Sequence, residues 1–153
     1  MLRKLYGVII SIHLKDFLHI MNDNIPEAKQ IIAIRTDLDM PVGKIAAQAS
    51  HASLGGLLRK MNKQEDNWTL NLKDDPELES WLTGKFVKIA VSVKSEAKLL
   101  ALHQKALDAG LNSVLIQDAG RTVFDGVPTY TCVAIGPHFA DKIDPVTKKY
   151  PLL

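Results

Sequence analysis

A carboxylate, a guanidinium and a hydroxyl follow one another closely in the segment LIQDAGRT, residues 115–122. An apolar run ends on Asp118, Gly120 permits a sharp turn, and Arg121 and Thr122 follow it. Aspartate and glycine are common turn formers, so an ordinary turn explains part of this pattern. An ionised aspartate can also orient a water molecule or hold a hydroxyl group. The segment therefore predicts a site if other polar residues point to the same place.

A second polar group lies on a predicted helix that begins at Gly43. Lys44, Gln48 and His51 are spaced i, i+4 and i+7 and share one helix face. A solvated stripe on a tightly packed helix is one interpretation. However, the first turn of a helix favours anions, so Lys44 is better explained if a phosphate or carboxylate binds there. A lysine that faces Asp118 would keep the carboxylate ionised and could stabilise developing negative charge.

Apolar runs and helical spacing predict the elements that must position these groups. The predicted strands span residues 31–36, 86–93, 113–117 and 130–135, with Gly136-Pro137 ending the last one. The predicted helices span residues 43–61, 76–82 and 96–109, the third capped by Ser95, with one further turn before Pro145. Residues 62–67 are predicted to be a polar linker.

Strands separated by helices favour parallel pairing, whereas the last two strands are joined by a loop and allow an antiparallel pair. The predicted fold class is therefore α/β, with a four-stranded mixed sheet and helices on both faces in three layers. Ligands of such sheets collect at the carboxyl ends of parallel strands. The loops after Thr36 and Gln117 both fall at such ends, on strands that we predict to be neighbours.

The composition excludes several classes of protein. A formal net charge of +2 over 153 residues excludes a broad basic field, so any nucleic-acid contact must come from a local patch. Cys132 is the single cysteine, which excludes an intramolecular disulfide and a zinc site built on cysteines. Nothing indicates an oxidising compartment, and we expect a cytoplasmic protein.

The first 28 residues are predicted to be an N-terminal extension of a domain that spans residues 29–153. Arg3 and Lys4 precede the apolar run LYGVIISIHL, which is too short to span a bilayer, so we expect no stable membrane association. Three interpretations stay open: an extra helix or strand packed on the domain, a weak membrane or targeting element, and non-native sequence upstream of a start at Met21.

Three blocks of the sequence, in order and with matching spacing, resemble the peptidyl-tRNA hydrolase 2 family, the archaeal and eukaryotic type. The blocks are IIAIRTDLDMPVGKIAAQASHASLG, SVLIQDAGRT and TCVAIGPHFADKIDPVTKKYPLL. The resemblance implies a four-stranded mixed sheet and hydrolysis of the ester that joins a peptide to the 3′ end of tRNA. It implies no metal or organic cofactor. The expected partner is peptidyl-tRNA rather than DNA, and a homodimer is possible.

Carried over residue by residue, the resemblance implies four catalytic residues. They are Lys44, Asp118, Thr122 and Thr131, with Thr129 as the alternative to Thr131. Asp118 would orient or deprotonate water, directly or through Thr122. Lys44 would stabilise the oxyanion or hold Asp118 ionised, and Thr131 would place the ester or the terminal ribose.

The predicted substrate-binding residues are Arg35, Gln48, His51 and Arg121. Gln48 and His51 match the helix pattern of the family. Arg35, next to Thr36 and near Asp37, can contact an RNA phosphate or pair with a carboxylate to hold the loop.

The chain departs from the family at two places. Ala49 stands where the family usually has a cysteine, so that cysteine cannot be needed for chemistry here. Pro41 and Val42 stand where the family often has a glycine and a basic residue. Two alternatives therefore stay open, namely a non-catalytic RNA-binding module and a hydrolase of another acylated tRNA.

Overall fold

The computed structural model describes residues 26–153, so the predictions for the N-terminal extension lie outside the described residues. No helix in this part of the chain is long and apolar enough to cross a bilayer.

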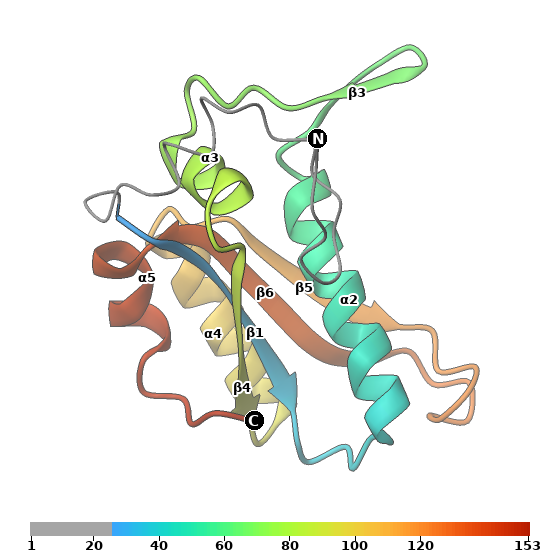
Figure 1. Ribbon diagram of the computed structural model, residues 1–153. Helices are drawn as coiled ribbons and strands as arrows, with labels where there is room; N and C mark the ends of the chain where they lie inside the picture. The colour runs from blue at the N-terminus through green and yellow to red at the C-terminus, as the bar shows by residue number, and fades with distance from the viewer. Residues whose placement is uncertain (1–25) are drawn as a thin grey trace, which may run out of the picture.

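Four strands form one mixed sheet in the order β4-β1-β6-β5 (Figure 1). Strand β1 (Ala28–Arg35) pairs in parallel with β4 (Val87–Val93) and antiparallel with β6 (Thr129–Phe139). Strand β5 (Ser113–Asp118) pairs antiparallel with the other side of β6. The predicted α/β class with a mixed sheet is confirmed, and the last two strands form the antiparallel pair that their connecting loop allows. Because β6 runs against both neighbours, β1, β4 and β5 all end at one edge of the sheet.

The strands that carry the two predicted halves of the site are not neighbours, and that prediction is wrong. Strand β6 lies between β1 and β5 and is hydrogen-bonded to both. Most of β6 is buried, including Thr131 to Pro137, which suits a central strand covered on both faces. The carboxyl ends of β1 and β5 still reach the same edge, with the start of β6 between them.

Helices cover both faces of the sheet. Helix α2 (Val42–Leu58) lies on one face, and α4 (Glu96–Asp108) and α5 (Ala140–Thr147) lie on the other (Figure 1). Alternate residues of β1 serve the two layers, as the pleat requires. Ile32 packs in the cluster beneath α2, whereas Ile31 packs in the cluster beneath α4 and α5.

The helix ends follow the predicted capping chemistry in part. Ser95 precedes α4, and its Oγ accepts from the backbone N–H of Lys98 at 3.3 Å, as the sequence predicts. Helix α3 (Pro76–Thr83) begins after Asp75, whose carboxylate accepts from Leu78 N–H at 3.1 Å. Helix α2 begins directly after Pro41 without a side-chain cap, which leaves its first N–H groups at the surface.

Three local predictions are wrong. The expected linker instead forms a hairpin of β2 (Asn62–Gln64) and β3 (Asn67–Thr69). All residues of these two strands are exposed, so the sequence has none of the alternation of apolar and polar residues that indicates a half-buried strand. Helix α5 continues through Pro145, because Ile143 and Val146 are buried in the core on either side of it.

Strand β6 also continues through Gly136-Pro137 to Phe139 instead of ending there. Gly136 has a φ of +90°, and a Cβ at this position would lie 2.9 Å from the Lys29 carbonyl oxygen. Glycine therefore lets β6 pass close to β1 where their pairing shifts register, and the strand is not interrupted.

We expect Leu102→Ala to lower the free energy of unfolding by about 2–5 kcal/mol, because it opens a cavity beneath α4. Leu102 is 1% exposed. Leu100→Ala on the exposed side of the same helix is the matched control, with an expected loss below about 1 kcal/mol. Urea unfolding monitored by circular dichroism would measure both, and equal losses would contradict the assignment of the buried face.

Candidate active site

An ion pair joins the start of α2 to the end of β5. Lys44 Nζ lies 2.7 Å from Asp118 Oδ2, across 74 positions of sequence. Lys44 Nζ also donates to Thr122 Oγ1 at 3.1 Å, just beyond the turn that follows β5. The Lys44 and Asp118 side chains are 12% and 15% exposed. The pair is therefore sheltered yet reachable from the surface, and three of the four predicted catalytic residues meet in it.

Two buried side chains hold Asp118 from the interior. Gln48 Nε2 donates to Asp118 Oδ2 at 2.8 Å, and Thr131 Oγ1 donates to Gln48 Oε1 at 2.6 Å. Gln48 is 2% exposed and Thr131 is fully buried. Thr129, the alternative to Thr131, donates instead to the Val127 carbonyl oxygen at 2.9 Å. Thr131 is thus the threonine that joins the cluster, and its hydroxyl reaches Asp118 through Gln48.

The turn after β5 fixes the other oxygen of Asp118. The backbone N–H of Gly120 donates to Asp118 Oδ1 at 2.8 Å. Gly120 has a φ of +80°, and a Cβ there would lie 2.4 Å from the Val127 carbonyl oxygen. Only glycine fits this turn, so the glycine of QDAGRT serves the carboxylate as well as the chain direction.

The Lys44 ammonium, together with N–H donors from Gly120 and Gln48, holds the pKa of the Asp118 carboxyl below its ordinary value. The hydrogen bond from Lys44 is the largest cause, and burial opposes it. Asp118 is consequently an anion at neutral pH. It is suited to orient a water molecule and is a weak proton acceptor.

The cluster retains unused hydrogen-bonding capacity at the surface. A carboxylate has about four acceptor positions, and the contacts of Asp118 to Lys44, Gln48 and Gly120 occupy three of them. An ammonium has three N–H groups, and those of Lys44 to Asp118 and Thr122 account for two. Since Thr122 accepts from Lys44, its own O–H is available as a donor. One acceptor and two donors therefore lie together, the set that ester hydrolysis requires.

Arg35 does not join this cluster. Its guanidinium donates to Asp37, to Glu96 and to the Tyr130 carbonyl oxygen, and these four hydrogen bonds occupy four of its five N–H groups. Arg35 is 8% exposed. Of the two predicted roles for Arg35, the geometry matches pairing with a carboxylate that holds the loop.

His51 and Arg121 lie outside the hydrogen-bonded cluster. His51 is exposed on α2, because the buried face of this helix runs through Gln48, Ala52 and Gly56. Arg121 is exposed next to Thr122. Both can be reached by a large substrate, but neither touches Asp118 in the structure.

Two contacts of the cluster had no sequence prediction. The Lys44 ammonium lies 5.6 Å from the centre of the Phe124 ring, a cation–π arrangement. The Cys132 thiol donates to the Gln48 carbonyl oxygen at 3.3 Å, and burial raises the pKa of this thiol to about 11. Cys132 is thus a buried packing residue, as its position in the middle of a strand indicates.

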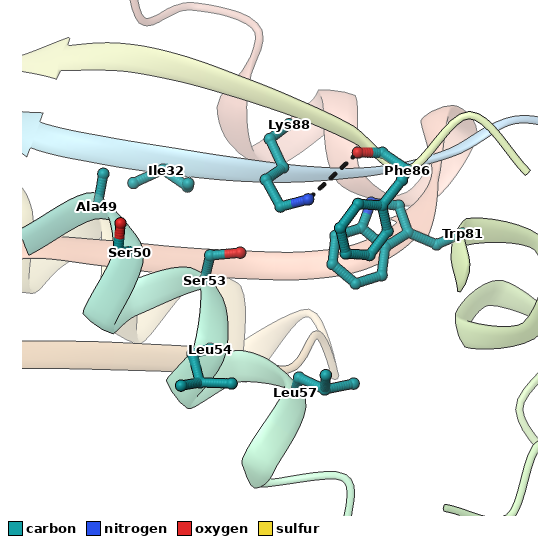
Figure 2. Close-up of a pocket in the computed structure, with 9 residues that line it drawn as sticks. All are labelled: Ile32, Ala49, Ser50, Ser53, Leu54, Leu57, Trp81, Phe86 and Lys88. Atoms are coloured by element: carbon teal, nitrogen blue, oxygen red, sulfur yellow. Dashed lines mark hydrogen bonds between the residues drawn. The ribbon is translucent and has the colours of Figure 1, made fainter. Parts of the chain in front are cut away.

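An apolar pocket of about 370 Å³ lies between α2, α3 and the strands beneath them (Figure 2). Leu54, Leu57 and Trp81 contribute to its walls, and Lys88 lies beside the Phe86 ring. None of the predicted catalytic or substrate-binding residues lines it. Within residues 26–153, no group of three or more His, Cys, Asp or Glu side chains is placed to hold a metal ion.

Comparison with known proteins assigns the family. The family model described as "Peptidyl-tRNA hydrolase PTH2" matches residues 28–153. The chain belongs to the PTH2 family.

The sequences of individual PTH2 relatives agree over the same region. The peptidyl-tRNA hydrolase of Methanopyrus kandleri is 39% identical over 125 residues, which cover 82% of this chain and 97% of that protein. The peptidyl-tRNA hydrolase of Sulfolobus acidocaldarius is also 39% identical, over 82% of this chain and 99% of its own length. The probable peptidyl-tRNA hydrolase 2 of Drosophila melanogaster is 38% identical over 87% of this chain and 64% of its own length.

We expect Lys44→Gln to raise the pKa of the Asp118 carboxyl, because it removes the cation that stabilises the carboxylate most strongly. The carboxyl ¹³C chemical shift of Asp118, followed by NMR from neutral to acidic pH, measures this. Lys60→Gln breaks the separate ion pair with Asp75 and should leave the Asp118 titration unchanged. An unchanged Asp118 titration in Lys44→Gln would show that the ion pair does not form in solution.

Proposed function

We propose that this PTH2 protein hydrolyses the ester bond between peptide and tRNA and so recycles the tRNA. The observation that carries the proposal is the surface contact of Lys44 with both Asp118 and Thr122, which leaves one acceptor and two donors open. The family supports the substrate, because the relatives are named peptidyl-tRNA hydrolases. A module that only bound RNA would need the lysine but would have no need of a sheltered carboxylate beside it.

The acceptor on Asp118 supplies the nucleophile. A water molecule donates a hydrogen bond to the remaining acceptor position of the carboxylate and turns a lone pair toward the ester carbon. Because the pKa of Asp118 is lowered, the carboxylate mainly orients this water and accepts its proton only in passing. The same lowering keeps the carboxylate ionised throughout the neutral range.

The donors of Lys44 and Thr122 serve the oxygens that become negative. The third N–H of Lys44 stabilises the oxyanion of the tetrahedral intermediate, where a fixed positive charge in a sheltered site is most effective. As the intermediate collapses, the bond between the carbonyl carbon and the ribose oxygen breaks. The proton lost by the water passes to that ribose oxygen, directly or through the Thr122 hydroxyl. The products are the free peptide acid and a tRNA with a free terminal hydroxyl.

Gln48 and Thr131 act as positioning residues in this proposal. Thr131 is fully buried, so its hydroxyl orients the Gln48 amide and does not place the ester itself. The amide in turn directs one N–H at Asp118 Oδ2 and fixes the carboxylate in the plane that Lys44 requires. This replaces the direct role in substrate placement that the resemblance implies for Thr131.

The tRNA is expected to bind through phosphate contacts that are largely indifferent to its sequence. Arg121 lies next to Thr122 and is exposed, so it can contribute one such contact. Arg35 already pairs with Asp37 and Glu96, which supports a role in holding the loop in place of a phosphate contact. A cytoplasmic location and a homodimer stay predictions, and neither is required by the geometry of the cluster.

We expect Asp118→Asn to lower kcat about 10²- to 10⁴-fold on N-acetyl-aminoacyl-tRNA, because asparagine cannot orient the water as an anion does. Lys44→Gln should lower kcat about 10²- to 10³-fold through loss of oxyanion stabilisation. Release of tRNA at neutral pH, with EDTA present, would measure both.

Asp125→Asn is a matched control for Asp118→Asn. Asp125 is exposed in the loop after β5 and has a φ of +50°, which asparagine also tolerates. It should cleave at the wild-type rate. If Asp118→Asn and Lys44→Gln fold normally and both retain wild-type kcat, the proposed function of the cluster is wrong.

The two threonines of β6 provide a separate test. We expect Thr131→Val to lower kcat about tenfold with little change in KM, because Gln48 loses the donor that fixes its amide. Thr129→Val is the matched substitution two residues away, and it should leave kcat close to that of the wild type. Equal effects of the two substitutions would contradict the assignment of Thr131 as the positioning residue.

A further inference from the structure

Three lysines converge on a pocket at the carboxyl end of β4. The pocket has a volume of about 410 Å³, and Lys94, Lys98 and Lys149 line it together with Tyr150 and Pro151. Lys94 follows β4 directly, Lys98 lies in the first turns of α4, and Lys149 lies in the segment after α5. Lys94 and Lys98 lie four positions apart, whereas Lys149 comes from a segment 51 positions after Lys98, so it is the fold that brings the third charge to the other two.

The lysine pocket has no charge partner of its own. None of its lining residues is acidic. Among the described residues, no carboxylate lies within 4.0 Å of these three lysines, whereas Lys29, Lys44 and Lys60 are each paired with an aspartate. Glu96 is near in sequence, but it is bound by Arg35. A net positive charge is therefore left facing the pocket.

Backbone pairing fixes the walls of the lysine pocket. The Pro151 carbonyl oxygen accepts from the backbone N–H of Ser92 at 2.8 Å, and Leu153 N–H donates to the Ala90 carbonyl oxygen at 3.1 Å. Val91 and Leu152 form an antiparallel bridge between these contacts. The C-terminal residues thus lie along the outer edge of β4 and carry Lys149 to the other two lysines. Little backbone ordering is needed when an anion binds, which favours affinity.

The lysine pocket and the candidate active site open at the same edge of the sheet. Strands β4 and β5 both end there, three strand spacings or about 14 Å apart, with Lys98 on the α4 side of the sheet and Asp118 on the α2 side. Figure 1 shows the C-terminus beside the end of β4, at the edge where α2 begins. A ligand that is large enough to pass around this edge can therefore touch Asp118 and the lysine pocket together.

We propose that the lysine pocket binds backbone phosphates of the tRNA while the ester lies at Lys44 and Asp118. This inference rests on the proposed function, because it takes the ligand at Asp118 to be an RNA. The scissile ester and the phosphates belong to one strand, so a phosphate site on the same edge raises affinity without contacting a base. Val42, which is 84% exposed, offers no charge at the start of α2. The lysine pocket supplies cations that this position and Arg35 do not.

The test replaces all three lysines and compares the result with an equal change of charge elsewhere. The pocket variant is Lys94→Gln/Lys98→Gln/Lys149→Gln. The control variant is Lys63→Gln/Lys73→Gln/Lys142→Gln, at exposed positions in β2, before α3 and in α5. Thermal unfolding verifies that each triple variant is folded. If a triple variant does not fold, its three single substitutions are measured in its place.

Binding of deacylated tRNA is measured by fluorescence anisotropy over a series of KCl concentrations. We expect the pocket variant to raise Kd about tenfold or more and to reduce the slope of log Kd against log salt by about two. The control variant should stay within about twofold of the wild type. Equal Kd values and equal slopes for the two variants would overturn the proposal.

Kinetics on N-acetyl-aminoacyl-tRNA separate this inference from the proposed function. The pocket variant should raise KM as it raises Kd and leave kcat within about twofold. A loss of kcat at unchanged KM would overturn the phosphate assignment. A wild type that binds tRNA but cleaves no ester would refute the proposed function, while the anisotropy comparison would still decide the role of the lysine pocket.

Binding of inorganic phosphate that depends on the three lysines, with tRNA affinity unaffected by their loss, would assign the pocket to a free anion and overturn the proposal.

Discussion

The carboxylate of Asp118 is the group on which the arrangement of the site depends. It accepts from the Lys44 ammonium, the Gln48 amide and the Gly120 backbone N–H, which come from one helix and one turn on opposite sides of it. A carboxylate held by three donors has one orientation, and its remaining acceptor position points in one direction. The same donors keep it ionised. One interaction therefore determines both the charge of the site and its geometry.

The mixed sheet makes this interaction possible. Because β6 runs antiparallel to both β1 and β5, the start of β6 lies between the carboxyl ends of its neighbours. Thr131 is placed under α2 by that arrangement, and Gln48 links it to Asp118. The buried Gln48–Thr131 contact satisfies both polar groups inside the core, and no buried side-chain N or O atom of the described residues lacks a partner. Structural satisfaction and catalytic positioning are thus achieved by the same two side chains.

Positive charge is distributed unevenly along the active edge. Arg35 is bound to Asp37 and Glu96, which closes the connection between β1 and α4. Lys44 is bound to Asp118. The lysine pocket at the end of β4 retains its charge because no carboxylate faces it. In a chain with a formal net charge of +2, the location of unpaired cations is more informative about an RNA partner than the total.

The types and order of the main elements could be predicted from the amino-acid sequence, because buried strands and capped helices are local patterns of apolar and polar residues. The positions of Lys44 in a first helical turn and of Asp118 at a strand end also made them candidates in the sequence, and the family resemblance added Thr122 to them. The order of the strands, the burial of Thr131 and the carboxylate partners of Arg35 became known only from the folded chain. These depend on contacts such as Arg35 with Glu96 and Thr131 with Gln48, which span 61 and 83 positions. Local patterns contain no information on contacts of that separation.

The exposed hairpin at residues 62–69 and the passage of α5 through Pro145 were not predicted for a related reason. The hairpin buries no apolar side chain of its own, and α5 is held by residues packed against a distant part of the chain.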